Sequence, residues 1–361
     1  MFLIEFSSLS HSELIQLADD KLRSELPDWE KNIWQFICDW FNPSITSIKI
    51  FTSGSTGAPK QIEHSKRAML NSSRLTCNAF QLKQNDFALL CLPVNKIAGI
   101  MMLVRSIYAR LNLYCLPPSA NPLKDLTGEI NIDFAAFTPM QLFGITENKN
   151  DFEKAARIKK ILLGGENVST TLQQAISNLP NDVYMSFGMT ETISHIALKK
   201  LNGNNADLHF EVLPEINISA NEENCLVIEA PVLGQPRLVT NDVVKIFSPK
   251  EFDWLGRIDN VINSGGIKIQ AEELEKKLHP HITIPFFVGA VADARTGEQV
   301  ILAIESENIT DKEKEKLQEA FLQFDKTHRP KSILLFEKFA RTENGKIKRK
   351  ETLKQPAKII Y

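Results

Sequence analysis

The sequence predicts a layered α/β protein that carries a small, mobile α+β domain at its C-terminal end. Short apolar runs alternate with amphipathic stretches of ten or more residues between residues 47 and 188, which indicates a sheet with crossover helices. The segment 208–247 is rich in strand-forming residues, and after Gly256 the pattern becomes a short mixture of helices and strands. A length of 361 residues is enough for two to three domains.

Two amphipathic helices are expected first, at 13–26 and 29–41, the second entered through Pro27 and Asp28. The alternating strands that follow are expected at 47–52, 87–93, 111–116, 134–137, 158–164 and 183–188. The helices between them are expected from Ser65, at 97–109 and from Ser169.

The later elements follow the same signals. The strands of the β-rich segment are expected at 209–213, 225–230 and 243–247. The C-terminal unit is expected to contain a helix at 271–278, strands at 286–292 and 300–305, a charged helix at 310–324 and a strand at 332–336.

The composition is that of an ordinary globular protein, with 43% hydrophobic and 24% charged residues, which excludes disorder and coiled coil as the main state. The 42 basic and 44 acidic residues leave a formal net charge of −2, so nucleic acids and anionic membranes have no general electrostatic reason to bind. Five scattered cysteines lack metal-ligand spacing and predict reduced, mostly buried thiols. With no leader and no apolar run of spanning length, we expect a cytoplasmic protein without a membrane span.

A loop rich in glycine and hydroxyl residues follows the strand at 47–52. Residues 51–60 read Phe-Thr-Ser-Gly-Ser-Thr-Gly-Ala-Pro-Lys. Convergent N–H groups, hydroxyls and a lysine suit a polyphosphate. The loop is not a Walker A motif, because Pro59 stands five residues after Gly54, where that motif requires glycine. We therefore predict a phosphate-binding loop of another type.

Further motifs follow in order. They read Leu-Leu-Gly-Gly-Glu at 162–166, Ser-Phe-Gly-Met-Thr-Glu-Thr at 186–192, Thr-Asn-Asp at 240–242, Gly-Arg-Ile-Asp at 256–259, Ser-Gly-Gly at 264–266 and Arg-Thr-Glu-Asn-Gly-Lys-Ile-Lys-Arg at 341–349. Together with 51–60, they resemble the adenylate-forming superfamily of acyl-CoA synthetases, luciferases and carrier-protein adenylation domains. The resemblance covers about residues 45–350. Three departures from its motifs are Phe187 for tyrosine, Asn241 for glycine and Arg341 for proline.

This resemblance implies a two-step reaction. A substrate carboxylate attacks the α-phosphorus of ATP, which expels pyrophosphate and leaves an acyl-adenylate. The thiol of coenzyme A then attacks the adenylate. Between the steps the small C-terminal domain swings about a hinge aspartate, which here is expected at Asp259 and divides the chain into 1–258 and 259–361.

The resemblance also implies roles for single residues. Lys346, Glu191 and Thr56 are implied in catalysis, and Glu191 is implied to hold Mg²⁺. Ser264, Gly265 and Gly266 are implied on the side that meets coenzyme A. The nucleotide-binding residues implied are Thr52, Ser53, Gly54, Ser55, Thr56, Gly57, Lys60, Gly164, Gly165, Glu166, Ser186, Phe187, Gly188, Met189, Thr190, Asp242 and Arg257.

The acid pocket is expected near residues 92–99, which resemble the family's segment beside the acyl group, with Lys96 where histidine is usual. Lys96 and Arg105 could supply positive charge for an acid with a second carboxylate, or they could simply snorkel or form ion pairs at the surface. Further acid-binding candidates are Gly188 and Ser194. Thr138 and Gln141 could line the same pocket or simply begin a helix.

The segments 92–105 and 190–197, with the short chain, look most like compact bacterial o-succinylbenzoate:CoA ligases of menaquinone synthesis, which implies 2-succinylbenzoate as substrate. Other readings are a CoA ligase for another aromatic or medium-chain acid, a carrier-loading adenylation enzyme, and a non-catalytic nucleotide-binding relative. The expected partners are the acid, ATP and coenzyme A, with monomer and homodimer both open. Because the loop at 51–60 comes early, we expect an abbreviated N-terminal subdomain.

Overall fold

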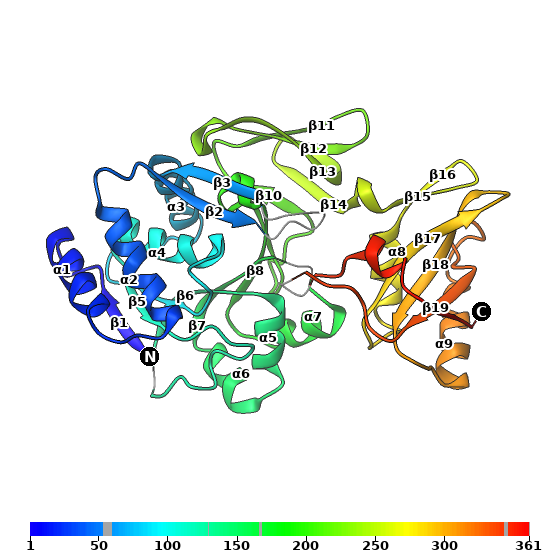
Figure 1. The fold of residues 1–361 in the computed structure, drawn as a ribbon, viewed down its shortest axis with the longest axis horizontal. Coiled ribbons are helices and arrows are strands. Elements are labelled where there is room, and N and C mark those ends of the chain that lie inside the picture. The colour runs from blue at the N-terminus through cyan, green and yellow to red at the C-terminus, as the bar shows by residue number, and fades with distance from the viewer. Residues whose placement is uncertain (53–59, 129, 166–167, 343–345, 361) are drawn as a thin grey trace.

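The computed structural model describes residues 1–52, 60–128, 130–165, 168–342 and 346–360. Within these ranges the chain forms a twelve-stranded sheet, a six-stranded sheet and a separate two-stranded hairpin. The two large sheets lie in different units that follow one another along the chain and meet near residues 257–261 (Figure 1). The mixed α/β class predicted from the sequence is confirmed.

The N-terminal unit is built on the twelve-stranded sheet, in the order β1-β5-β4-β6-β7-β8-β9-β10-β14-β13-β12-β11. Its strands are β1 (Phe2–Glu5), β4 (Phe87–Leu90), β5 (Asn112–Cys115), β6 (Ile132–Phe137), β7 (Ile158–Leu163), β8 (Asp182–Gly188), β9 (His195–Lys200), β10 (Phe210–Val212), β11 (Asn217–Ala220), β12 (Cys225–Ala230), β13 (Gln235–Ser248) and β14 (Glu251–Arg257). The hairpin consists of β2 (Ser47–Thr52) and β3 (Lys60–Ser65).

Strands β5, β4, β6, β7 and β8 are parallel neighbours. The chain passes from β4 to β5 on one side and then returns to add β6 on the other side. Such a switch in strand order opens a crevice beyond the carboxyl ends of the strands, where ligands of open α/β sheets bind. The predicted motifs after β7 and within β8 lie at this same edge.

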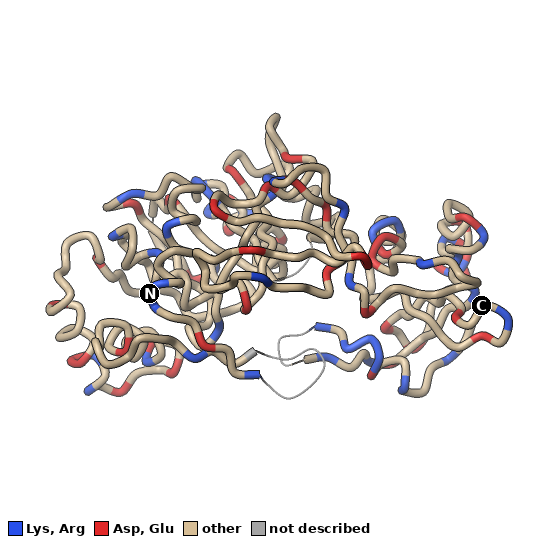
Figure 2. Tube along the Cα trace, turned by 90° about the horizontal axis from the view of Figure 1, so that it is seen from above, with Lys and Arg blue, Asp and Glu red and all other residues tan. Residues whose placement is uncertain are grey.

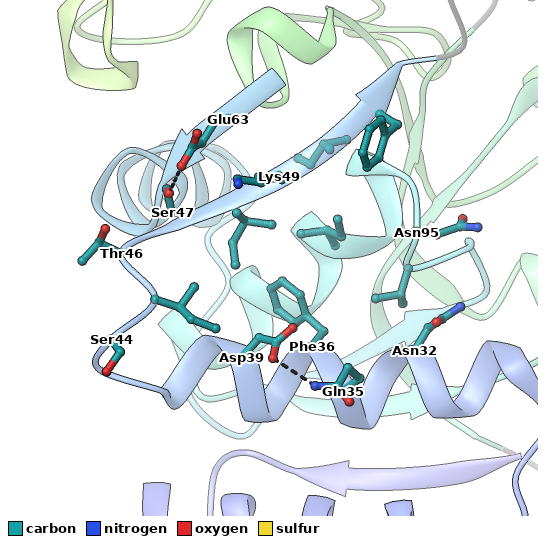
Figure 3. A pocket seen from close by; sticks show the side chains of 16 residues that line it. Asn32, Gln35, Phe36, Asp39, Ser44, Thr46, Ser47, Lys49, Glu63 and Asn95 are labelled. Atoms are coloured by element: carbon teal, nitrogen blue, oxygen red, sulfur yellow. Dashed lines mark hydrogen bonds between the residues drawn. The ribbon is translucent and has the colours of Figure 1, made fainter. Parts of the chain in front are cut away.

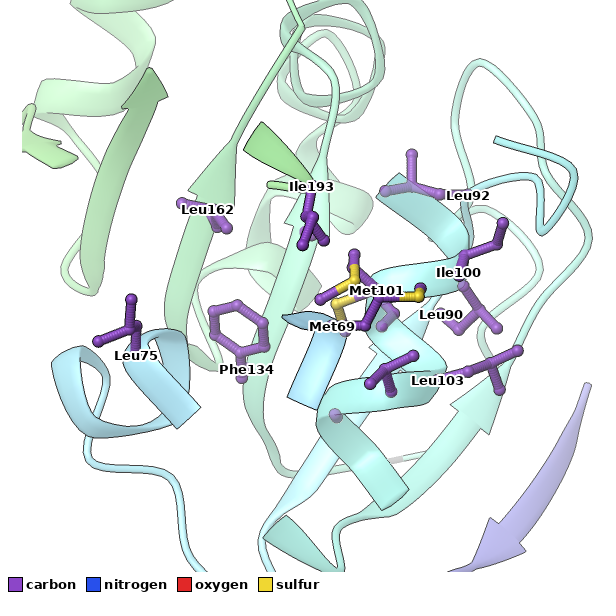
Figure 4. Close-up of a cluster of buried hydrophobic side chains, with 14 of the residues drawn as sticks. Met69, Leu75, Leu90, Leu92, Ile100, Met101, Leu103, Phe134, Leu162 and Ile193 are labelled. Carbon is purple, nitrogen blue, oxygen red and sulfur yellow. The ribbon is translucent and has the colours of Figure 1, made fainter. Parts of the chain in front are cut away.

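Helices cover both faces of the parallel strands. They are α1 (His11–Leu22), α2 (Asp28–Phe41), α3 (Lys66–Ala79), α4 (Ile97–Ala109), α5 (Pro139–Thr146), α6 (Lys149–Ala155) and α7 (Thr170–Ser177). Strand β4 shows why two layers form: Ala88 and Leu90 join one buried cluster, whereas Leu89 and Cys91, which directly follows the strand, join the other. Figure 4 shows the first cluster, in which Met69 of α3 and Met101 of α4 meet the sheet residues Leu90 and Phe134.

Local sequence signals account for most helix boundaries. Ser65 accepts a hydrogen bond from the backbone N–H of Ala68 at 3.2 Å and begins α3 as predicted. The helix α4 has the predicted bounds. The prediction for the first helix was wrong at both ends: a capping box between Ser10 and Glu13 starts α1 at His11, and α1 ends at Leu22.

The C-terminal unit contains the six-stranded sheet. Its elements are β15 (Val261–Ser264), β16 (Ile267–Gln270), α8 (Ala271–Leu278), β17 (Phe286–Asp293), β18 (Gly297–Glu305), α9 (Asp311–Phe321), β19 (Ser332–Phe336), α10 (Arg349–Thr352) and β20 (Lys358–Ile359). The predicted helix at 271–278 and the predicted strand at 332–336 have the observed bounds. The predicted charged helix is shorter, because Thr310 caps α9 and the helix ends at Phe321.

Basic and acidic residues are mixed over both units (Figure 2), in keeping with the small net charge. A denser basic run follows the grey trace in the C-terminal unit, where the sequence from Lys346 reads Lys-Ile-Lys-Arg-Lys. No helix among the described residues is long and apolar enough to cross a membrane. All five cysteines are free thiols, and four of them are buried, as expected from their scatter.

Candidate active site

Two predicted motif segments meet where β7 and β8 end. Leu163 lies opposite Met185 in this parallel ladder, so Gly164 and Gly165 follow directly beside Ser186. The Ser186 hydroxyl donates to the carbonyl oxygen of Leu163 at 2.7 Å. A Cβ on Gly164 would lie 2.9 Å from Ser186 Oγ, so a larger residue there would force the serine hydroxyl to move.

The aromatic residue of the second motif packs against two other phenylalanines and stays half-buried. Phe187 is half-buried, and its ring makes edge contacts with Phe210 and Phe252 at centroid distances of 5.8 and 5.1 Å. The next residue, Gly188, is exposed at the end of β8, and a Cβ there would lie 2.4 Å from the carbonyl oxygen of Ser194. A flat ring beside an uncovered backbone can stack a nucleotide base.

The turn after β8 is tied to the hairpin that leads out of the predicted phosphate loop. Thr190 and Glu191 lie in the short helix η1 (Thr190–Thr192). His64 of β3 is buried, and its Nε2–H donates to the carbonyl oxygen of Thr190 at 2.7 Å. Burial lowers the pKa of His64, so the ring is neutral and donates through Nε2. Sequence reasoning missed His64, because nothing in its neighbourhood marks it.

The carboxylate of Glu191 forms no hydrogen bond or ion pair with any described residue. Its negative charge lies close enough to His64 to raise the pKa of that histidine, although burial lowers the pKa more. A lone, half-buried carboxylate beside a phosphate loop fits Mg²⁺, which is usually held in proteins by one or two carboxylates together with substrate phosphates and water. The described residues contain no cluster of three or more histidine, cysteine, aspartate or glutamate residues that could hold a metal ion alone.

The third and fourth motifs meet across the ladder of β13 and β14, where Asp242 pairs with Arg257. Asp242 is buried, and its Oδ1 accepts from the Trp254 indole N–H at 3.0 Å and lies 3.7 Å from Arg257 Nη1. Since both of these contacts use Oδ1, Oδ2 is left to accept hydroxyl groups. Trp254 is a partner that the motifs do not name.

Asp259 accepts hydrogen bonds from two residues that lie in β13 and at the end of β14. The Nδ2 of Asn241 and the Nη2 of Arg257 each lie 3.1 Å from Asp259 Oδ2. Asn241 is the residue that replaces the glycine of the family motif. The departure therefore adds a contact between β13 and the short helix η3 (Ile258–Asn260) that contains Asp259.

Arg105 and Ser194, two of the predicted acid-binding residues, lie in direct contact. Arg105 Nη2 donates to Ser194 Oγ at 2.6 Å, and only 2% of the arginine is exposed. The surface alternative for Arg105 is therefore wrong. No carboxylate among the described residues pairs with this guanidinium, and its Nε has no hydrogen-bond partner there. Burial lowers the pKa of Arg105 to about 10, which leaves it charged at neutral pH.

Two other acid-pocket candidates take different places. Lys96 is half-buried at the N-terminus of α4, about 13 Å of helix away from Arg105. Thr138 and Gln141 form a capping box that starts α5, and the Gln141 amide donates to the carbonyl oxygens of Cys91 and Ser119 at 3.2 and 2.9 Å. Of the two alternatives for Thr138 and Gln141, the structure thus shows the start of a helix, and both side chains take part in its cap.

The segment with Lys346 is held by its flanks. The N–H of Thr342 donates to the carbonyl oxygen of Lys346 at 2.9 Å, and Arg341 forms a bridge to Ile347. Arg341, which replaces the family's proline, forms a two-pronged ion pair with Glu305 of β18. Lys346 itself is exposed, and the chain on either side of 343–345 extends toward the N-terminal unit (Figures 1 and 2).

The Ser-Gly-Gly segment forms the tip of the β15–β16 hairpin. Gly265 and Gly266 both have positive φ, at 59° and 81°, which fits a two-residue hairpin turn, and the Gly265 N–H donates to the carbonyl oxygen of Thr296 at 2.8 Å. Since β15 begins directly after η3, the hairpin tip with Ser264 lies at the end of the hairpin that is away from η3 (Figure 1).

A cavity of about 610 Å³ lies between α2 and the β2–β3 hairpin (Figure 3). Its walls include Phe36 and Asp39 of α2, Ile50 of β2, and Val94 and Asn95 from the predicted acyl segment. None of Lys96, Arg105 and Ser194 lines this cavity.

Several predicted residues have no structural description. The backbone of Thr52 ends β2 opposite Lys60, which begins β3. The remaining phosphate-loop candidates and the last residue of the motif at 162–166 lie outside the described residues; they are Ser53, Gly54, Ser55, Thr56, Gly57 and Glu166.

Comparisons with known proteins identify relatives for most of this chain. The family model of AMP-binding enzymes matches residues 6–216. The 2-succinylbenzoate–CoA ligase of Haemophilus influenzae is 27% identical over 258 residues, which cover 68% of this chain and 55% of that protein. The chain thus spans little more than half the length of this curated relative.

Solved structures agree in fold. An acyl-CoA synthetase (AMP-forming)/AMP-acid ligase II-like protein from Dyadobacter fermentans is 35% identical, with a TM-score of 0.64 and coverage of 94% of this chain and 97% of that one. The o-succinylbenzoate coenzyme A synthetase of Bacillus subtilis, in complex with ATP and magnesium, is 19% identical, with a TM-score of 0.70 and coverage of 84% and 69%. From the motifs at the sheet edge and these matches, we conclude that the chain belongs to the family of AMP-binding enzymes.

Proposed function

We propose that this protein is an AMP-forming acid:CoA ligase that makes an acyl-adenylate and then a thioester. The observation that carries the proposal is the convergence of the motifs at one sheet edge. Ser186, Glu191 and Ser194 follow one another through the end of β8 and the turn behind it, and Ser194 contacts the buried Arg105. A nucleotide at the β8 end and an acid near Arg105 would meet at this turn.

The adenylation step needs groups that stabilise negative charge on the α-phosphate while pyrophosphate leaves. In the proposal, Phe187 stacks the adenine, Asp242 accepts the ribose hydroxyls and Lys60 binds phosphate oxygens. Lys346 contributes positive charge to the reacting phosphate from the C-terminal unit. Bound at Glu191, Mg²⁺ would neutralise phosphate charge.

The same proposal assigns the acid. Arg105 is a buried cation without a carboxylate partner among the described residues, and a buried charge is costly unless a partner compensates it. A substrate with a second carboxylate supplies that partner. The names of the curated relatives point the same way, and 2-succinylbenzoate carries one carboxylate to activate and another to bind.

The domain arrangement belongs to this proposal. We take 1–258 as the domain that binds ATP and the acid and 259–361 as a lid that rotates about Asp259. In the structure the segment flanking 343–345 extends toward the N-terminal unit, whereas the tip at Gly265 lies away from it (Figure 1). This orientation supports an adenylating state, and the Ser264–Gly266 side would approach coenzyme A after rotation.

The test is pyrophosphate release with ATP, Mg²⁺ and a panel of aromatic and aliphatic acids. The proposal expects release with 2-succinylbenzoate. Release with only other acids would favour an acyl-CoA synthetase of different specificity, and loading of a carrier protein in place of coenzyme A would favour a carrier-loading adenylation enzyme. No release with any acid would favour a non-catalytic nucleotide binder.

A further inference from the structure

A row of buried polar side chains leads away from Arg105 into the core between α3 and β9. Arg105 contacts Ser194, whose Oγ lies 3.3 Å from His195 Nδ1. The other ring nitrogen, Nε2, lies 3.4 Å from Thr76 Oγ1. Arg105, His195 and Thr76 are each at most 5% exposed, so water cannot readily replace these partners. Thr76 lies outside every motif that the sequence singled out, and His195 lies in the segment 190–197, to which the resemblance gave no role for this histidine.

The Thr76 end of this row points to one direction for its hydrogen bonds. The Thr76 hydroxyl donates to the carbonyl oxygen of Ser72 at 3.1 Å, and in this arrangement it has no second proton to give. Thr76 Oγ1 must therefore accept from His195, which places the ring proton on Nε2. A neutral ring with Nε2–H has a bare Nδ1, and Nδ1 then accepts the proton of Ser194.

The positive charge of Arg105, at the other end of the row, agrees with this direction of the hydrogen bonds. Arg105 can only donate, so the Ser194 oxygen accepts from Nη2 while its own proton goes to His195. Burial and the nearby Arg105 charge hold the pKa of His195 well below its usual range, which keeps the ring neutral. A neutral His195 adds no second positive charge beside the guanidinium.

We propose that His195 is a positioning residue, which Thr76 holds as the Nε2–H tautomer so that Ser194 turns its lone pairs to Arg105 and fixes the guanidinium for a carboxylate of the substrate. The part that concerns the carboxylate rests on the proposed function; the tautomer does not. The opposite tautomer would donate from Nδ1 to Ser194. The serine proton would then be free to turn elsewhere, and the orientation of the serine–arginine pair would be less restricted.

The tautomer is read directly by long-range ¹H–¹⁵N correlation spectra of protein labelled at histidine, with the His195 signals assigned by their loss in His195→Gln. We expect a protonated Nε2 and a bare Nδ1 at neutral pH. Thr76→Val, which removes the acceptor without changing the side-chain shape, should lose this preference, and Thr76→Ser should restore it. An Nδ1–H tautomer or a doubly protonated ring in the wild-type protein would overturn the proposal, whether or not the valine variant folds.

Kinetics test the role in binding. With Thr76→Val the KM for 2-succinylbenzoate should rise about fivefold, the effect of losing one hydrogen bond of ~1 kcal/mol, while kcat and the KM for ATP stay as in the wild type. The KM for 3-benzoylpropionate, which lacks the ring carboxylate, should not change. An equal rise for both acids, or none for either, would overturn the positioning role. Should the wild type activate neither acid, the proposed function fails and the tautomer spectrum alone decides on His195.

Discussion

Gly164 and Ser186 lie so close that a Cβ on the glycine would be 2.9 Å from the serine hydroxyl oxygen. The serine cannot simply turn away, because its hydroxyl donates to the carbonyl oxygen of Leu163 at 2.7 Å. The contact joins two motifs that are more than twenty residues apart in sequence. It holds the end of β7 against β8 at the edge where the nucleotide is proposed to bind.

Gly164→Ala should therefore destabilise the protein by about 1–3 kcal/mol, the usual cost of forcing an extra group into a tight contact. Adenylation should fall with it. Ser186→Ala removes the hydroxyl, so the double variant should recover part of the stability lost by Gly164→Ala alone. Urea unfolding of both single variants and the double variant measures this coupling. Strictly additive losses would show that the contact with Ser186 is not what disfavours alanine at position 164.

Stability should depend on pH through His195. Its folded-state pKa lies well below the value near 6.5 of an unfolded histidine, because of burial and the Arg105 charge. Below pH ~6.5 the unfolded chain takes up a proton that the folded protein refuses, so the stability present at higher pH is lost as the pH falls, by ~1.4 kcal/mol per pH unit.

In urea unfolding at pH 7.5 and 5.5, His195→Gln should lose less stability between the two values than the wild type does. His64 and His279, whose pKa values burial also lowers, keep a slope in both proteins and serve as the internal reference. Equal losses in the two proteins would mean that His195 titrates normally in the folded state.

The contact between Asn241 and Asp259 should restrain the rotation of the C-terminal unit. Asn241→Gly restores the residue usual in the family motif and removes the 3.1 Å hydrogen bond, which is partly exposed and worth at most ~1 kcal/mol. Distances between spin labels on the two units should spread over a wider range in this variant. Asn205→Gly, in the exposed loop between β9 and β10, is the control. An unchanged distance distribution would contradict the restraint.

Lys346→Ala should separate the two half-reactions. Pyrophosphate release should fall to background, because the variant lacks the cation proposed at the reacting phosphate. A preformed acyl-adenylate should still be converted to the thioester, since that step needs no side chain from this segment. Lys350→Ala, a neighbouring exposed cation, is the matched control. Unimpaired pyrophosphate release by Lys346→Ala would remove the lysine from the adenylation site.

Much of the fold follows from sequence period and capping residues. The helix α4 and the strands β2 and β19 have the predicted bounds, because a strong apolar pattern and clear flanking signals coincide there. Strand β1 was missed. Its four residues carry little pattern, and it exists because its edge pairs with β5, where Phe2 lies opposite Cys115. Such pairing depends on a distant segment that local sequence does not reveal.

The candidate site shows the same limit. The motifs located Gly164, Ser186 and Asp242, since their residue types and order are distinctive. They could not show that Arg105 is buried against Ser194, because a lone arginine on a helix is more often at the surface. Nor could they assign roles to His64 or His195, which contact Thr190 and Thr76, each more than 100 residues away in sequence. The replacement at Asn241 acquires meaning only through its contact with Asp259.

The most direct test of the account is to identify the products formed from ATP, Mg²⁺, 2-succinylbenzoate and coenzyme A by mass spectrometry. The account predicts equal amounts of AMP and 2-succinylbenzoyl-CoA, with 2-succinylbenzoyl-adenylate accumulating when coenzyme A is left out. Formation of ADP in place of AMP, or the absence of any nucleotide product with this acid, would contradict it.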